Sequence, residues 1–215
     1  MPAQYQIARV ELAKRSLSPD PSQSLSPDPS PTGEGSGYAQ AIRLLQECLE
    51  YPHHLGEGKL YGAQENDFYY FLGVAYDRLG QTEKARECWE EATKGPQEPA
   101  AAMYYNDAKP DKIFYQGMAL LRLGRRDEAN GRFYRLINYG KQHLFEKQTM
   151  DYFAVSLPDL LIWEDTLDVK NRIHCLYMLA LGYYGMGDYE KSSRYLAEVE
   201  QLDINHYGTQ ALKGL

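Results

Sequence analysis

The feature that most constrains the fold is a helix–turn–helix unit that recurs along the chain. In its clearest copy, residues 67–92, apolar residues fall at helical spacing on both sides of a turn at 79–82. Small residues, Gly73 and Ala85, stand where two backbones must come close. Because a short helix with one apolar face cannot bury that face alone, the pattern predicts two amphipathic helices folded back on each other.

The spacing of the small residues identifies two further copies of the unit. The pair lies 12 positions apart in every copy, as Gly73 and Ala85, Gly117 and Ala129, and Ala180 and Ser192. From Gly73 to Gly117 the step is 44 residues, so the helical pair is preserved while the joint between pairs has grown. The sequence therefore predicts an all-α fold of antiparallel helix pairs stacked side by side.

The first copy resembles the tetratricopeptide repeat. Its residues follow that family's order, with Tyr69-x2-Leu72-Gly73-x2-Tyr76, then Ala85-x3-Trp89, then Pro96. The resemblance implies a right-handed α-α superhelix, a solenoid of helix pairs. Across about Tyr38 to Ala211, longer strings such as NRIHCLYMLALGYYGMGDYEK look like the C-terminal repeat region of large bacterial proteins that carry a domain of unknown function. That second resemblance implies no reaction.

Changes in composition predict the domain organisation. Residues 1–15 give a weak helical signal, and 16–37 form a Pro/Ser-rich linker with a near-exact duplication of SLSPDPS. Residues 38–215 form the repeat domain, which starts with a helix like the second one of a pair. An insertion at 139–171 separates the second copy from the third, and its apolar stretch must pack on something. After residue 202, a partial terminal helix is expected to cover the open end.

Composition and charge limit the classes of function. The net charge of −7, with no Lys/Arg cluster, argues against nucleic-acid binding and suits a neutral or basic partner. Three isolated cysteines predict packed, reduced thiols. The N-terminal stretch lacks an apolar core of signal-peptide length and no run approaches a membrane span, so we expect a cytoplasmic protein with no membrane contact.

The first helix of each pair is expected to line the concave side of such a solenoid. Tyr70, Phe114 and Tyr177 occupy equivalent positions and would form an aromatic ladder. The predicted peptide-binding stripe consists of Asp67, Tyr70, Val74, Asp77, Arg78, Asp111, Phe114, Met118, Leu121, Arg122, His174, Tyr177, Leu181 and Tyr184. Two interpretations stay open with equal weight: a groove for a peptide or for a helix of another domain, or a groove that the 139–171 insertion itself fills.

The leading hypothesis is a non-catalytic scaffold that binds a protein or peptide, without cofactor or metal. Some tetratricopeptide repeats bind the terminal carboxylates of chaperones through Lys and Asn. In this sequence, Tyr70 and Val74 occupy those positions. An acid–base cluster of Asp168, Asn171 and His174 is a weaker reading, and His53, His54 and His143 lack metal-ligand spacing. The alternative function is an accessory helical domain of a carbohydrate-active system, in which the aromatic ladder contacts glycan or a partner enzyme. A separate hypothesis is sugar stacking by the aromatic and acidic residues Tyr104, Tyr105, Asp107, Trp163 and Glu164.

Overall fold

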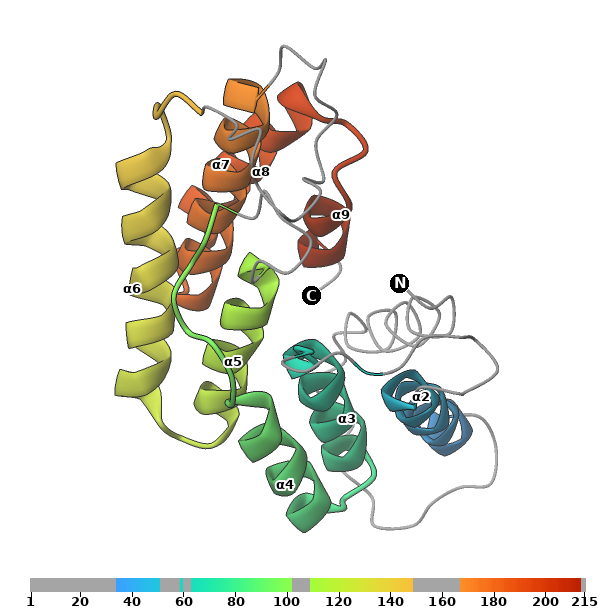
Figure 1. The fold of residues 1–215 in the computed structure, drawn as a ribbon. Helices are drawn as coiled ribbons and strands as arrows, with labels where there is room; N and C mark the ends of the chain where they lie inside the picture. The colour runs from blue at the N-terminus through green and yellow to red at the C-terminus, as the bar shows by residue number, and fades with distance from the viewer. Residues whose placement is uncertain (1–33, 51–58, 60–62, 102–108, 149–166, 214–215) are drawn as a thin grey trace. The chain divides into compact units, whose positions relative to one another are not determined.

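The computed structural model describes residues 34–50, 59, 63–101, 109–148 and 167–213. Every regular element in these ranges is an α-helix, which confirms the predicted all-α class (Figure 1). The helices are α2 (Glu34–Leu49), α3 (Asn66–Arg78), α4 (Thr82–Ala92), α5 (Pro110–Arg122), α6 (Arg126–His143), α7 (Leu167–Gly185), α8 (Tyr189–Leu202) and α9 (Tyr207–Lys213).

Several predictions fall on parts of the chain outside the described residues. These are the helical segment 1–15, the linker up to residue 33, His53 and His54, and the carbohydrate candidates Tyr104, Tyr105, Asp107, Trp163 and Glu164. Helix α2 begins at Glu34, inside the segment 16–37 that composition assigns to the linker. Helix α6 ends at His143 and α7 begins at Leu167, so both ends of the 139–171 insertion belong to repeat helices.

The chain divides into two compact units, residues 1–94 with 213–215, and residues 95–212. In the first unit, α3 packs against both α2 and α4. In the second, α5, α6 and α7 each pack on the next helix along the chain, and α5 also contacts α7. Packing between neighbours in sequence, pair after pair, is the arrangement of a tetratricopeptide-like helical solenoid.

The turn between the two helices of a pair has the same backbone geometry in all three copies. Its glycine has a positive φ, +69° at Gly80, +77° at Gly124 and +80° at Gly187. The next amide donates to the carbonyl five residues earlier at 2.9 Å, from Gln81 to Tyr76, from Arg125 to Leu120 and from Asp188 to Tyr183. This is a Schellman motif, in which glycine adopts the left-handed conformation without steric cost. The three predicted copies are therefore structurally equivalent units.

The two helices of a pair approach most closely at the small residues. A Cβ added at Gly73 would overlap the indole of Trp89, and one added at Gly117 would overlap the ring of Phe133. In both pairs the aromatic residue follows the glycine by 16 positions. In the third pair, Ala180 carries a Cβ, and the residue 16 positions later is the smaller Leu196. A larger residue on one helix is thus matched by a smaller one on the other, as close packing requires.

Helix α2 has the burial pattern of a second helix of a pair. Ala41, Leu45 and Cys48 are all buried, at the spacing that Ala85, Trp89 and Ala92 have on α4. By this spacing, α2 corresponds to α4, α6 and α8, and it packs on α3, as α4 does. The interpretation of residues 38–51 as the second helix of a pair agrees with this burial.

The long helices α6 and α7 lie side by side and hold the second unit together (Figure 1). Two glycines permit the close approach: a Cβ on Gly140 would lie 2.8 Å from the carbonyl oxygen of Cys175, and one on Gly182 would lie 2.9 Å from that of Phe133. This packing sets α7 beside α5, so that the ring of Phe114 lies 5.9 Å from that of Tyr184. The first helices of two successive pairs are therefore neighbours, as in a solenoid.

Candidate functional site

In the first unit, the predicted stripe lies on α3 and is mostly buried. Asp67, Tyr70 and Val74 are buried, whereas Asp77 and Arg78 in the last turn are exposed. The backbone carbonyl of Tyr70 accepts a hydrogen bond of 3.3 Å from Nε1 of Trp89. On α3, solvent therefore reaches the charged end of the stripe and not its aromatic residue.

In the second unit, the part of the stripe on α5 runs from a buried ring to an exposed guanidinium. Phe114 is completely buried, and its ring packs on Phe133 at 6.1 Å between centroids. Asp111, Met118 and Leu121 are partly exposed, and Arg122 is exposed. Met118 and Arg122 follow Phe114 by one and two helical turns, so the three residues lie in one row along the helix.

On α7, the stripe is covered at one end and open at the other. Tyr177 and Leu181 are buried, whereas His174 and Tyr184 are partly exposed. The ring of Tyr177 lies 4.8 Å from that of His206, edge to face. The three equivalent rings Tyr70, Phe114 and Tyr177 are thus all buried, and the binding role of the stripe stays a prediction.

Tyr189, the first residue of α8, extends this surface. Its side chain is 61% exposed, and its ring lies 5.1 Å from that of Tyr184, edge to face. Phe114, Tyr184 and Tyr189 therefore form a chain of rings that leads from the core to the solvent. An aromatic residue two positions after the turn glycine, at the first position of α8, is the signal that could have identified Tyr189 from the sequence.

A second group of rings and cations lies between α7 and α8. Tyr183 and Tyr195 are stacked, with centroids 5.7 Å apart and planes 14° apart. Lys191 lies 5.1 Å from the Tyr183 ring, and Lys84 lies 5.4 Å from the Tyr76 ring. Each lysine follows its tyrosine by eight residues. The same cation–π contact therefore joins the two helices in the first and third pairs.

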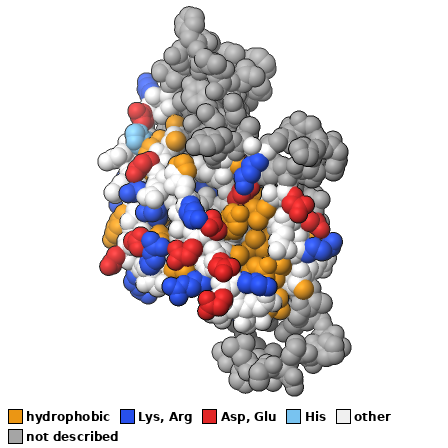
Figure 2. All heavy atoms as spheres, turned by 60° about the horizontal axis from the view of Figure 1, so that its bottom comes forward, with side chains coloured by type: hydrophobic (Ala, Val, Ile, Leu, Met, Phe, Trp, Pro, Cys, Tyr) orange, Lys and Arg blue, Asp and Glu red, His pale blue; other side chains and the backbone are white. Residues whose placement is uncertain are grey.

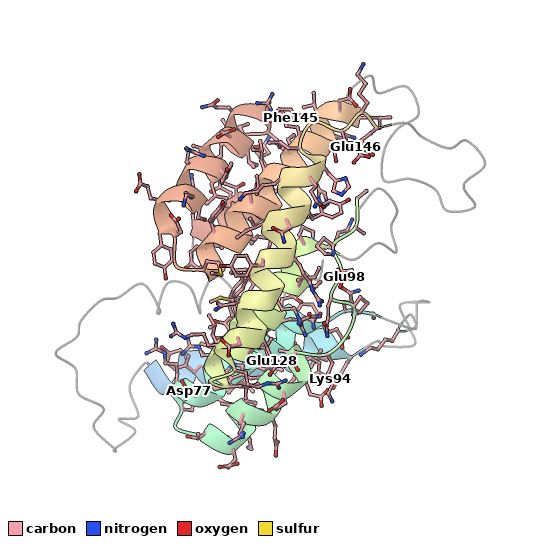
Figure 3. All side chains as sticks on the ribbon, turned by 90° about the vertical axis from the view of Figure 1, so that its left-hand side faces the viewer. Asp77, Lys94, Glu98, Glu128, Phe145 and Glu146 are labelled. Atoms are coloured by element: carbon pink, nitrogen blue, oxygen red, sulfur yellow. The ribbon has the colours of Figure 1, made fainter. Side chains whose placement is uncertain are left out.

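The three residues of the acid–base hypothesis are engaged by backbone groups. His174 Nε2 lies 2.8 Å from the carbonyl oxygen of Ala100. Asn171 donates to the carbonyl of His143, the last residue of α6, at 2.8 Å and to that of Glu146 at 3.3 Å. Glu146 lies just beyond the end of α6 (Figure 3). The carboxylate of Asp168 accepts from the amide of Gln148 at 2.9 Å. These side chains form hydrogen bonds with backbone groups that have no partner within a helix, and they connect α7 to the segments that precede it.

The cysteines lie in environments that suppress thiolate formation. Cys48 and Cys175 are buried and Cys88 is partly buried, all three as free thiols. Burial raises the pKa of the Cys88 thiol to about 11, and the carboxylates of Glu87 and Glu91 add to the effect. Burial, aided by Glu146, also raises the pKa of Cys175 to about 11. These thiols therefore behave as packing groups.

We expect native Cys88 and Cys175 to be alkylated slowly by iodoacetamide at pH 8. A pKa near 11 leaves roughly a hundredfold less thiolate than an ordinary cysteine has at this pH. Mass spectrometry of the labelled native chain measures the rate, with the urea-unfolded chain as the control. Labelling of both native thiols at the unfolded rate would contradict this assignment.

The described residues hold no group of three or more His, Cys, Asp or Glu side chains arranged to bind a metal ion. His143 instead pairs with Glu146 next to it on the same turn. None of the described helices is both long and apolar enough to cross a membrane. On the face shown in Figure 2, acidic and basic side chains alternate without a continuous patch of one sign.

The comparison with known families identifies one segment of the chain. Residues 67–94 match the family model described as Tetratricopeptide repeat. The matched segment covers α3 and α4, the pair closed by the turn at Gly80. The match and the recurrence of this turn in two further pairs support the assignment of the helix pair α3–α4 to the tetratricopeptide-repeat family, a class of helical repeats suited to protein–protein interaction.

Proposed function

We propose that this chain is a non-catalytic scaffold that binds a segment of another protein. The proposal is supported by the tetratricopeptide match over α3–α4 and by two further pairs with the same turn. Stacked helix pairs of this kind present extended surfaces made by the first helix of each pair. Such a surface receives an extended peptide or an amphipathic helix through side chains that repeat from pair to pair.

Within the second unit, the binding surface is assigned to α5, α7 and the first residue of α8. We define the α5–α7 face as Met118, Arg122, Tyr184 and Tyr189. The observation that carries the proposal is the exposed ring of Tyr189, held against Tyr184, which in turn packs on the buried Phe114. Tyrosine and arginine dominate binding energy at protein interfaces, because they combine a large contact area with hydrogen bonds.

Most of the remaining residues of the stripe are buried, and two exposed charged residues lie on the first unit. Tyr70, Val74 and Asp67, with Phe114, Tyr177 and Leu181 in the second unit, are buried and shape the helices from beneath. The exposed Asp77 and Arg78 offer charged contacts on α3. With a net charge of −7, the chain favours a neutral or basic partner.

The test compares two double variants of equal chemistry. The first, Arg122→Glu with Tyr189→Ala, removes the exposed part of the α5–α7 face. The second, Arg126→Glu with Tyr134→Ala, changes an exposed arginine and a tyrosine that is 52% exposed elsewhere in the same unit. The immobilised chains capture proteins from a lysate, quantitative mass spectrometry identifies them, and calorimetry measures each purified candidate.

A specific partner should bind the wild type and the second variant alike and lose roughly tenfold or more in affinity for the first. The loss is expected because Tyr189 and Arg122 offer the exposed ring and charge of the face. Equal binding to all three chains would place the interaction elsewhere on the molecule. The scaffold function would be contradicted if all three chains capture the same proteins and none of these proteins binds in calorimetry.

A further inference from the structure

The residue that precedes α9 caps this helix through its imidazole. Nδ1 of His206 lies 3.2 Å from the backbone nitrogen of Thr209, which donates to it, and 3.0 Å from the Thr209 hydroxyl. An acceptor for the amide three residues into a helix is the role of an N-cap side chain. Because Nδ1 accepts this amide, it carries no proton, and the capping form of His206 is the neutral ring with its hydrogen on Nε2.

The capped helix covers one of the residues of the predicted stripe. His206 lies against the Tyr177 ring, and a Cβ added at Gly208 would overlap that ring, so α9 is in direct contact with it. Thr209 and Leu212 on α9 are buried, and Tyr177 itself is only 7% exposed. Tyr177 is thus covered by the short helix α9.

Protonation of His206 removes the cap. A proton on Nδ1 turns the acceptor into a donor that faces the Thr209 amide, and it places a positive charge at the helix N-terminus, where the macrodipole disfavours it. A helix of seven residues has little stability of its own, so it depends on its cap and on the contact with Tyr177. Loss of the cap therefore weakens the docking of the whole helix.

The charges around the ring set the direction of the pH response. Burial lowers the pKa of His206 below its usual value, and this outweighs the carboxylates of Asp203 and Asp111, which raise it. The Tyr177 phenol faces the same ring from α7. Because the docked state has the lower pKa, docking is fully stabilised above the ordinary histidine pKa. This stabilisation is lost as the pH falls through the lowered value.

We propose that His206 and α9 form a pH-operated latch: the neutral ring docks α9 over Tyr177, and the protonated ring releases it. Release exposes Tyr177, which belongs to the part of the predicted stripe on α7. More of the stripe would then be available to the segment of the partner protein. This second consequence rests on the scaffold function, whereas the latch itself does not.

Amide hydrogen exchange of the full chain at pH 7.5 and pH 5.0, corrected for the intrinsic exchange rates, tests the latch without any binding partner. In the wild type, protection of residues 207–213 should fall roughly fivefold or more at pH 5.0, as expected for the loss of an N-cap. His206→Asn keeps an oxygen that can cap the helix and does not titrate, so its protection should not change with pH. His143→Asn alters a histidine on α6, and α9 should keep the wild-type response.

Equal pH responses in the wild type and in His206→Asn would overturn the latch. A second measurement needs no variant: the Hε1 resonance of His206 should titrate with the same midpoint as the exchange of α9, and separate midpoints would also overturn it. If the capture experiment yields a partner, its binding should strengthen at pH 5.0 for the wild type and not for His206→Asn. The exchange test needs no binding partner, so its outcome for the latch does not depend on whether the scaffold function is correct.

Discussion

Gly117→Ala is expected to lower the free energy of unfolding of the second unit by about 1–3 kcal/mol, the range for overpacking a dense core. The added methyl group would overlap the ring of Phe133, which is completely buried and cannot move into solvent. Chemical denaturation followed by far-UV circular dichroism measures the change. Alanine is normally favoured over glycine in a helix, so helix propensity alone would make this variant more stable. A loss of stability therefore indicates the close contact between α5 and α6.

The matched control is Gly131→Ala on α6, where a Cβ meets no atom within 4 Å. This change should stabilise the protein by about 0.5–1 kcal/mol, because only the helix propensity changes. The third pair suggests a rescue, since it combines Ala180 with Leu196 at the equivalent positions. The double variant Gly117→Ala with Phe133→Leu should therefore lose less free energy of unfolding than the two single variants lose together. Equal stabilities of Gly117→Ala and Gly131→Ala would contradict the close approach.

Phe133→Ala is expected to have the largest effect, a loss of about 3–5 kcal/mol. The ring packs on Phe114 and occupies the space that Gly117 and Gly185 leave open, so it fills the region between α5, α6 and α7. Removing it leaves a cavity that the three helices can close only by moving their backbones. Thermal and urea unfolding measure the loss in the same chain.

The neighbouring Tyr134→Ala provides the control, because this tyrosine is the next residue along α6 and is 52% exposed. Its replacement should change the stability by no more than about 0.5 kcal/mol. A small effect of both changes would mean that α6 does not hold the second unit together. Comparable large effects would mean that residue size on α6, rather than burial, decides the cost.

The sequence was sufficient to identify the helix pairs and to align them. The turn glycines Gly80, Gly124 and Gly187 follow Gly73, Gly117 and Ala180 by seven residues in each pair, and the structure has the same motif in all three. These features are local, because a left-handed residue and a helix period depend on residues a few positions apart. This is why the fold class and the repeat could be predicted without coordinates.

Which residues of the stripe reach the solvent could be predicted only in part. Tyr70, Phe114 and Tyr177 were expected to form an aromatic ladder along a groove, but all three are buried. Helical periodicity locates an apolar face, yet it does not distinguish a face that packs on other helices from one that is open to a ligand. The exposure of Tyr189 could not be predicted for the opposite reason, since a single aromatic residue after a turn has no period.

By itself, the sequence determined the all-α class, the positions of the turns and the small residues at which the two helices of each pair meet. Only the tertiary structure decided which rings reach the solvent, that α9 lies on Tyr177, and that Asn171 and His174 bind backbone carbonyls of distant segments. The physical reason is range: turns and helix periods depend on neighbouring residues, whereas burial depends on contacts between residues far apart in the chain.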